Sequence, residues 1–240
     1  MTDALPGAYD VMGSGPLLLL VPGGAGHPMG LGPLTERLAA RFTVVTYDPL
    51  GLAHGRLGLP VADQRVADWS EGAHRVLETV LPAGESAYVF GTSSGGIAVL
   101  DLLARHPRRL AHVVAHEPPC VTLLPDGAER RTELIGRLDG PERAPAEGEP
   151  ATAMGVFLAR VLRPFTAHAP AFTAAPGRLT LAAGTDSRGQ LLYRTAEFLS
   201  EYLGGVFAEF PGGHLGTLDH PVDFADLLAD TFLSSARTSA

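Results

Sequence analysis

One short segment, residues 88–100, constrains the fold of this chain more than any other. It begins with the apolar run 88–90 and ends with apolar residues at the spacing of a helix. Between the two lies the pattern Gly-x-Ser-x-Gly, formed by Gly91, Ser93 and Gly95. A strand that turns sharply into a helix holds its central residue in a strained backbone conformation, and bulky side chains two positions before and after it would collide. The pattern therefore predicts a tight bend that leaves the Ser93 hydroxyl above a sheet, at a helix N-terminus whose dipole favours an anion.

This strand, bend and helix resemble the nucleophile elbow of the α/β-hydrolases, and the likeness extends from about Val11 to Phe232. Ser94 competes with Ser93 for the role of nucleophile, but the residue two positions before Ser94 is Thr92 instead of glycine. Ser93 therefore fits the steric rule better. The resemblance implies an α/β-hydrolase fold in which Ser93 is the catalytic nucleophile.

Apolar runs of strand length alternate with longer segments of helical periodicity along the chain. This alternation predicts an α/β protein with a mostly parallel, doubly wound sheet, whose active groups gather beyond the carboxyl ends of the strands. A chain of 240 residues is expected to form a single α/β-hydrolase domain, 1–240. Strands are expected at 8–12, 17–21, 43–47, 88–90, 110–119, 179–183 and 206–210, and helices at 31–42, 63–81, from the bend to Pro107, at 128–138, 152–162, 195–203 and from Pro221 onward.

Residues 120–177 interrupt this alternation. Two helices are expected there, joined by a segment, 139–150, that is rich in proline, glycine and glutamate and is expected to be a mobile linker. In the α/β-hydrolases an insertion at this place forms a cap over the active site, so the resemblance implies a small helical cap insertion. A cap of this kind predicts a partly apolar, gated pocket. Four apolar residues of the segment are expected to face either the substrate or the core: Phe157, Leu158, Val161 and Phe165.

The net charge is −8, from 18 basic and 26 acidic residues, and it disfavours nucleic acid or an anionic membrane as a partner. Cys120 is the one cysteine, so no intrachain disulfide forms and a cytoplasmic location is expected. The first residues lack the basic and apolar parts of a secretory signal, and the apolar run 17–21 is too short to span a bilayer. No Cys/His spacing is typical of a zinc site, so no metal is expected. No cofactor is expected either, and the sequence leaves the oligomeric state open.

A serine hydroxyl needs a base within hydrogen-bond reach, and the base needs a carboxylate that holds its tautomer. The α/β-hydrolase order predicts a histidine just after the last strand, and His214 follows there in a glycine-rich loop. His220, at the start of the closing helix, is a weaker candidate. His54 is interpreted as a solvated residue of a loop at the pocket rim.

Two carboxylates compete for the role of the acid. The α/β-hydrolases commonly place it after the preceding strand, three residues beyond a glycine, where this chain has Ser187, with Asp186 one residue earlier. Asp186 is the preferred candidate because the chain order serine, aspartate, histidine matches the family. Glu117, at the end of the strand before the expected cap, is the alternative acid, or else a buried structural residue.

The segment 22–24, Pro-Gly-Gly, follows the second apolar run, where the α/β-hydrolases usually carry His-Gly-x. The resemblance implies that the backbone N–H groups of Gly24 and Ser94 form an oxyanion hole. Backbone donors do not depend on the missing histidine, so this departure is mild.

These residues favour a serine hydrolase that cleaves a small to medium apolar ester, thioester or lactone through an acyl-enzyme on Ser93. The expected partner is a small molecule with an apolar acyl or alcohol part. Opening of haloalkanes or epoxides is disfavoured, because relatives with those activities carry aspartate at the position of Ser93.

The alternative is a repurposed α/β-hydrolase fold: a biosynthetic cyclase, a C–C bond hydrolase, a lyase or a non-catalytic binding protein. The shifted position of Asp186 gives this alternative weight. The runs 115–119 and 210–214 resemble those of actinobacterial α/β-hydrolases of mostly unassigned substrate, which narrows the family and leaves the chemistry open.

Overall fold

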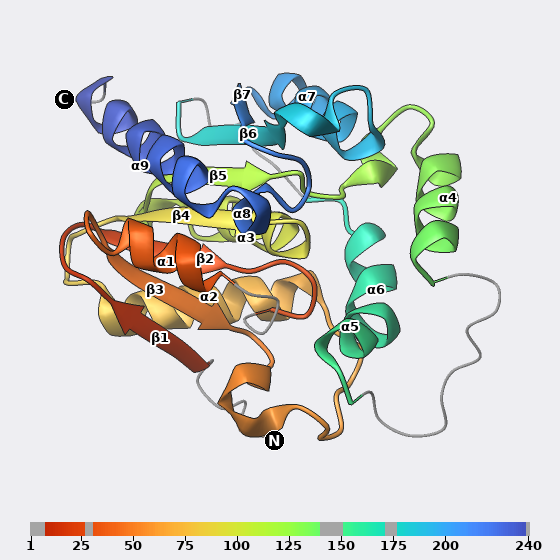
Figure 1. Cartoon of the computed structure of the whole chain (residues 1–240), viewed down its shortest axis with the longest axis horizontal. Coiled ribbons are helices and arrows are strands. Elements are labelled where there is room, and N and C mark those ends of the chain that lie inside the picture. Colours follow the sequence, from red (N-terminus) through yellow and green to blue (C-terminus); the bar gives the residue numbers. More distant parts are fainter. Residues whose placement is uncertain (1–7, 27–30, 140–150, 171–176, 239–240) are drawn as a thin grey trace.

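The computed structural model describes residues 8–26, 31–139, 151–170 and 177–238. These residues form a central seven-stranded sheet with helices on both faces (Figure 1). Its strands are β1 (Ala8–Met12), β2 (Leu17–Val21), β3 (Thr43–Asp48), β4 (Ala87–Thr92), β5 (Leu110–His116), β6 (Leu179–Gly184) and β7 (Val206–Phe210). Their order is β1-β3-β2-β4-β5-β6-β7, and only β1 runs antiparallel to its neighbour. The mostly parallel α/β sheet predicted from the alternation of apolar runs is therefore confirmed.

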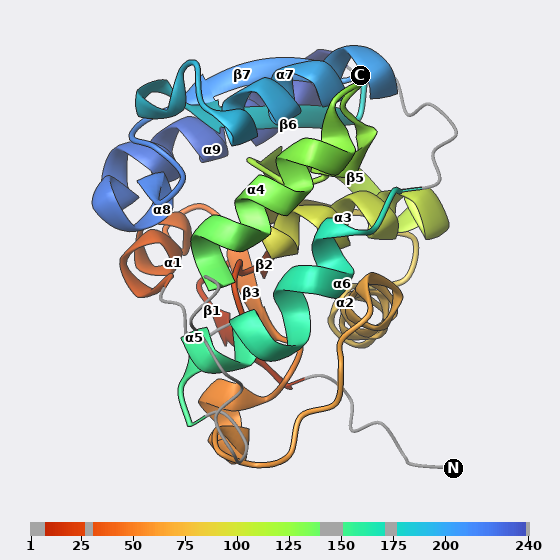
Figure 2. The same ribbon diagram turned by 90° about the vertical axis from the view of Figure 1, so that its right-hand side faces the viewer.

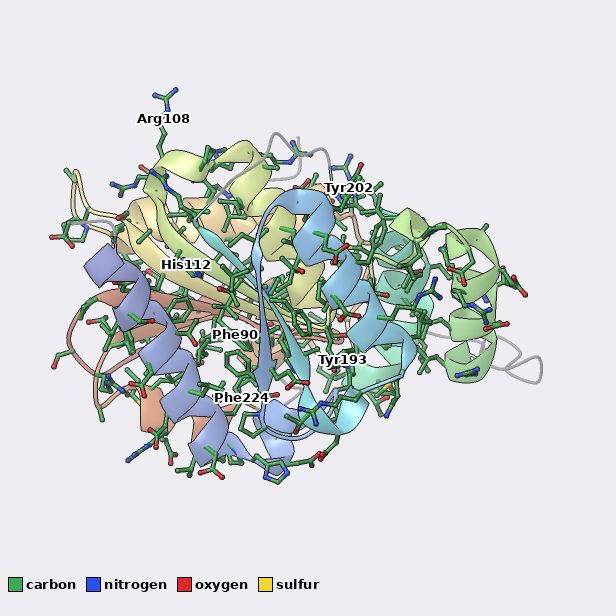
Figure 3. The ribbon with its side chains drawn as sticks, turned by 90° about the horizontal axis from the view of Figure 1, so that it is seen from above. Phe90, Arg108, His112, Tyr193, Tyr202 and Phe224 are labelled. Carbon is green, nitrogen blue, oxygen red and sulfur yellow. The ribbon has the colours of Figure 1, made fainter. Side chains whose placement is uncertain are left out.

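Side chains of the central strands point alternately into two separate cores, because successive residues of a strand face opposite sides of a sheet. In β2, Leu19 and Val21 face one helical layer, whereas Leu18 and Leu20 face the other. Figure 3 shows the second core from above, with Phe90 of the sheet packed against Phe224 of the last helix. The first layer consists of α2 (Val66–Val80), α3 (Ser94–Arg105) and α7 (Leu191–Leu203), and the second of α1 (Gly32–Leu38) and α9 (Pro221–Thr238).

The segment between β5 and β6 carries the helices that were expected to form a cap. It contains the 3-10 turn η4 (Val121–Leu123), α4 (Gly127–Asp139), α5 (Ala153–Val156), the π-helical turn η5 (Phe157–Val161) and α6 (Leu162–Thr166). Figure 2 shows α4, α5 and α6 in front of the carboxyl ends of the central strands, and we refer to these three as the covering helices. Apart from Asp139, the predicted linker 139–150 lies outside the described residues.

The single helix expected over 152–162 is divided, and a proline explains why. Pro164 has no N–H group with which to bond the carbonyl four residues earlier, that of Arg160, so the chain widens into η5 just before it. The Arg160 carbonyl instead accepts a hydrogen bond of 2.9 Å from the backbone N–H of Gln64. This bond ties the covering helices to the segment that leads into α2.

Other boundaries also differ from those expected: α1, expected over 31–42, ends at Leu38, and α2, expected over 63–81, begins at Val66. The strand predicted over 110–119 ends at His116, because Glu117 adopts a positive φ of 42° that no strand continues. Helix α7 begins at Leu191, four residues before the expected start. A short helix that the sequence did not suggest, α8 (Gly216–Asp219), follows β7 and precedes α9.

Helix α3, which begins directly after Ser93, is anchored by a buried carboxylate, Asp101. It accepts hydrogen bonds from the hydroxyl of Ser70 in α2 and from Arg105 (2.6 Å), and His168, just after α6, lies 3.3 Å from its second oxygen. Burial alone would raise the pKa of Asp101, but the hydrogen bonds from these three partners lower it to about 2. The carboxylate thereby links α3 to the neighbouring helix and to the end of the covering helices.

Candidate active site

The bend between β4 and α3 has the strained geometry that the sequence predicts. Ser93 adopts φ 53° and ψ −123°, one of two positive-φ conformations at a non-glycine residue in the described part of the chain. A Cβ atom on Gly91 would approach the carbonyl oxygen of Gly95 to 2.4 Å, and a Cβ atom on Gly95 would approach that of Val21 to 2.0 Å. Both glycines are therefore required by backbone contacts, and the bend presents the Ser93 side chain at the carboxyl edge of the sheet.

His214 lies beside Ser93, although 121 positions separate them in the sequence. Its Nε2 atom is 3.2 Å from the Ser93 hydroxyl oxygen, within hydrogen-bond distance. The loop between β7 and α8 that carries His214 folds tightly at Gly212, which has φ 79° and whose missing Cβ would stand 2.7 Å from the His220 ring. The histidine expected after the last strand therefore reaches the serine of the bend.

The other ring nitrogen of His214 is bound by Glu117. Its Nδ1 atom lies 2.9 Å from one carboxylate oxygen of Glu117, and the backbone N–H of Gly184 donates to the second oxygen at 3.0 Å. Only 1 % of Glu117 is exposed. Such burial alone would raise the pKa of Glu117, but the hydrogen bonds from His214, the Ser187 hydroxyl and the Gly184 N–H lower it to about 2. Glu117 is therefore an ionised carboxylate at neutral pH, aimed at the imidazole.

The structure brings Glu117, the alternative acid, into contact with His214, and it does not bring Asp186 there. Asp186 is exposed, and its backbone N–H donates to the Gly212 carbonyl at 2.9 Å. Successive side chains of a 3-10 turn point about 120° apart, so in the turn after β6 Asp186 is exposed while Ser187 is buried beside Glu117. The turn therefore does not bring the displaced Asp186 to His214. The alternative acid, Glu117, lies beside the ring instead.

Gly24 and Ser94 lie together next to Ser93. The Ser94 hydroxyl donates to the carbonyl oxygen of Gly24 at 2.8 Å, which holds the loop after β2 against the start of α3. Ser94 is therefore engaged in this contact, and it is Ser93 that faces His214. Gly24 itself adopts φ 59°, a conformation that glycine takes without strain. Within the described residues, neither the Gly24 N–H nor the Ser94 N–H donates to a backbone carbonyl.

The remaining histidines considered from the sequence lie elsewhere. His54 bonds to the buried Asp48 at 2.8 Å and to Asp10 at 3.4 Å, so it joins the loop after β3 to β1. His220 is exposed and stands against Gly212, outside the contact with Ser93. The buried His116 packs on Phe224, and burial lowers its pKa to about 4, so it is neutral at pH 7.

An apolar pocket of about 400 Å³ opens above Ser93 and His214. It lies between the loop after β2 and the covering helices. Phe157, expected to face either substrate or core, lines it, whereas Leu158, Val161 and Phe165 are buried in the core clusters. Its apolar walls include Leu31, Leu134, Leu138, Met154, Phe157 and Leu162.

Sequence reasoning did not single out the arginines near this site. Arg130 and Arg137 share one face of α4 with Leu134, at spacings of four and three residues that place side chains on one side of a helix. Arg194, in the first turn of α7, holds Asp126 with two bonds of 2.9 Å. The helical spacing of charged residues around Leu134 was the signal available in the sequence.

Among the described residues, no three His, Cys, Asp or Glu side chains are grouped so as to hold a metal ion. None of the helices in the described ranges is both long and apolar enough to cross a membrane.

Comparison with known proteins identifies the family. Residues 18–227 match the model of the alpha/beta hydrolase family. The chain is 33% identical over 257 aligned residues to YraK, a hydrolase of Bacillus subtilis strain 168, and the alignment covers 95% of this chain and 94% of that one. The fold is similar to that of an esterase from Thermogutta terrifontis (TM-score 0.70, 16% identity, 98% and 97% of the two chains covered). It is also similar to that of the enol-lactonase from Burkholderia xenovorans LB400 (TM-score 0.60, 19% identity, 95% and 96% covered).

The chain therefore belongs to the α/β-hydrolase family. It is a hydrolase of that family and has its fold, as the sequence predicted. Membership of the family implies a small molecule as substrate.

Proposed function

We propose that this protein is a serine hydrolase that cleaves a small to medium apolar ester, thioester or lactone through an acyl-enzyme on Ser93. One observation carries the proposal: the unbroken chain of contacts from the Ser93 hydroxyl to His214 (3.2 Å) and from His214 to the buried Glu117 (2.9 Å). A serine, an imidazole and a carboxylate in this order are what an activated hydroxyl requires.

The ionised Glu117 selects the tautomer of His214. A carboxylate only accepts hydrogen bonds, so His214 Nδ1 carries the proton, and Nε2 is left free to accept the proton of Ser93. As the Ser93 oxygen attacks the substrate carbonyl, its proton moves to Nε2, and the adjacent carboxylate stabilises the imidazolium that forms.

The remaining steps use groups at the same edge of the sheet. The N–H groups of Gly24 and Ser94 stabilise the oxyanion of the tetrahedral intermediate. The imidazolium of His214 gives its proton to the departing alcohol or thiol, and the acyl group stays on Ser93. Water then attacks the acyl-enzyme with His214 as the base, which releases the acid and restores the hydroxyl.

The apolar pocket supports an apolar acyl group. Its volume of about 400 Å³ and its leucine, methionine and phenylalanine walls suit an aliphatic or small aromatic chain placed next to Ser93. Burial of such a chain contributes roughly 0.8 kcal/mol per CH₂ group, so longer acyl chains should be favoured until the pocket is full.

The alternative of a repurposed fold drew its weight from the displaced Asp186. With Glu117 in contact with His214, that displacement no longer leaves the histidine without a carboxylate. The serine hydrolase is therefore the better supported function.

The proposal is tested by hydrolysis of p-nitrophenyl butyrate. The wild-type protein should release p-nitrophenol, whereas Ser93→Ala and His214→Ala should lose about 10³-fold or more in kcat while keeping the wild-type far-UV spectrum. Ser234→Ala, on the exposed end of α9, is the matched control and should retain full activity. Equal turnover by Ser93→Ala and the wild type would refute the proposal.

A further inference from the structure

A second cavity, of about 600 Å³, also reaches His214 but is not lined by the loop after β2. We call it the polar cleft. It runs between α4 and the start of α7, and its inner end reaches Glu117 and His214. Its polar walls are formed by Arg130, Glu133, Arg137, Gln190 and Arg194.

The polar cleft and the apolar pocket meet at one place. Leu134, Leu192 and His214 line both, so the two cavities adjoin at the imidazole. Ser93 and Gly24 line only the apolar pocket, and Glu117 lines only the polar cleft. The two compartments therefore lie on different sides of the catalytic contact between Ser93 and His214.

The reaction geometry assigns a part of the substrate to each compartment. A leaving group must lie next to His214, because Nε2 hands it a proton, while the carbonyl oxygen points at Gly24 and Ser94. The acyl chain then occupies the apolar pocket beside Ser93, and the leaving group continues past His214 into the polar cleft.

Among the described residues that line the cleft, Arg137 is the arginine without an acidic partner. Arg130 is bound by Asp126 (2.9 Å) and Glu133 (2.7 Å), and Arg194 is bound by Asp126. Arg137, one helical turn beyond Leu134, is exposed and makes no ion pair with any described residue. Its guanidinium offers a planar fork of N–H donors that matches a carboxylate or phosphate group.

We propose that the substrate has two unlike ends: an apolar acyl group, and an alcohol or thiol part that carries an anionic group bound by Arg137. The inference rests on the proposed function and deepens it, because it selects open-chain esters and thioesters over simple lactones, whose leaving oxygen stays attached to the acyl part. Arg137 is a specificity-determining residue in this account and takes no part in proton transfer.

The test compares two phenyl esters that share the same apolar acyl group. One is the hexanoate ester of para-hydroxyphenylacetate, whose leaving group is an anion; the other is the hexanoate ester of para-hydroxyphenylacetamide, which is neutral and nearly the same size. The wild-type protein should prefer the anionic ester by about threefold to tenfold in kcat/KM, as expected for one partly exposed charge pair. Raising the salt concentration to about 0.5 M should reduce that preference.

Variants locate the preference. Arg137→Gln should bring the ratio to about one through a loss of kcat/KM for the anionic ester, and Arg137→Lys should keep part of the preference because it keeps the charge. Arg108→Gln removes an equal charge from a side chain that extends into solvent away from α4 (Figure 3), and it should keep the wild-type ratio. This control separates a local contact from the effect of net charge.

The proposal is overturned if the wild type shows no preference, or if Arg137→Gln leaves the ratio unchanged. It is also overturned if Arg137→Gln impairs hydrolysis of a phenyl hemiester of adipic acid, whose anion lies on the acyl side, more than that of the anionic phenol ester. Failure of the wild type to hydrolyse any of these esters would instead remove the serine hydrolase function itself, and this inference with it.

Discussion

Replacing Glu117 by glutamine should reverse the direction of the hydrogen bond to His214. In the wild type, one carboxylate oxygen accepts from the Gly184 N–H at 3.0 Å and the other lies 2.9 Å from His214 Nδ1. In the variant, the amide oxygen would keep the bond from Gly184, so the amide NH₂ group would face Nδ1. An amide N–H only donates, so Nδ1 would have to accept and the ring proton would move to Nε2. Ser93 would then face a donor and lose its base.

The size of the effect follows from the charge that is lost. The pKa of Glu117 falls from 4.5 to about 2 in this site, a difference that corresponds to on the order of 3 kcal/mol in favour of the carboxylate. The same carboxylate stabilises the imidazolium in the transition state, so loss of that charge should lower kcat by on the order of 10²-fold. The wrong tautomer adds to this, so we expect a total loss of about 10³-fold to 10⁴-fold.

The assay is kcat for p-nitrophenyl butyrate, measured for the wild type, Glu117→Gln and the matched variant Asp186→Asn. Asp186→Asn makes the same chemical change at an exposed side chain, and it should keep kcat within about twofold. Far-UV spectra and thermal unfolding establish that both variants are folded. A greater loss in Asp186→Asn than in Glu117→Gln would refute the reasoning.

Three further results are expected from other parts of the structure. Gly95→Ala should destabilise the fold by about 3 kcal/mol or more in urea unfolding, because its Cβ would meet the Val21 carbonyl oxygen at 2.0 Å; a loss below about 1 kcal/mol would contradict this geometry of the bend. Asp101 has a lowered pKa, from 3.8 to about 2, so its ionisation stabilises the fold above about pH 4, and this contribution is lost as the pH falls toward 2. Asp101→Asn should flatten that part of the pH–stability curve, and an unchanged slope would argue against the anchor. Phe157→Trp should shorten the longest p-nitrophenyl ester chain that is accepted, and an unaltered chain-length profile would show that the acyl group lies elsewhere.

The bend was predictable from local backbone physics, because Ser93 is surrounded by glycines that a strand-to-helix turn needs. The distant histidine was predictable from the resemblance to the α/β-hydrolases, whose chain order places a histidine just after the last strand, where His214 lies.

The partner of His214 depended on information that the local sequence does not contain. Asp186 and Ser187 are neighbours in one turn, and only the three-dimensional course of that turn decides which of them points inward. Glu117 follows a different strand, and it reaches His214 because β5 lies next to β6, with the Glu117 N–H bonded to the Ala182 carbonyl at 2.9 Å. Strand order and register are long-range properties, so the sequence left this choice open.

Two features had weaker signals in the sequence: the polar cleft, and the place where the covering helices are divided. Pro164 marks the place where the helix widens, but the partner that rescues the Arg160 carbonyl, Gln64, lies far away in the chain. The role of Arg137 likewise depends on which acidic residues pair with the other arginines. Those ion pairs join α4 and α7 to Asp126, in the loop before α4.

The most direct test of the central claim is the mass of the intact protein after reaction with a fluorophosphonate, followed by identification of the modified residue. The account predicts a single adduct on Ser93 in the wild type, its absence in Ser93→Ala, and a rate of labelling that drops steeply in His214→Ala. An unmodified wild-type protein, or an adduct on Ser94 or any other residue with Ser93 untouched, would contradict the claim that His214 and Glu117 activate the Ser93 hydroxyl.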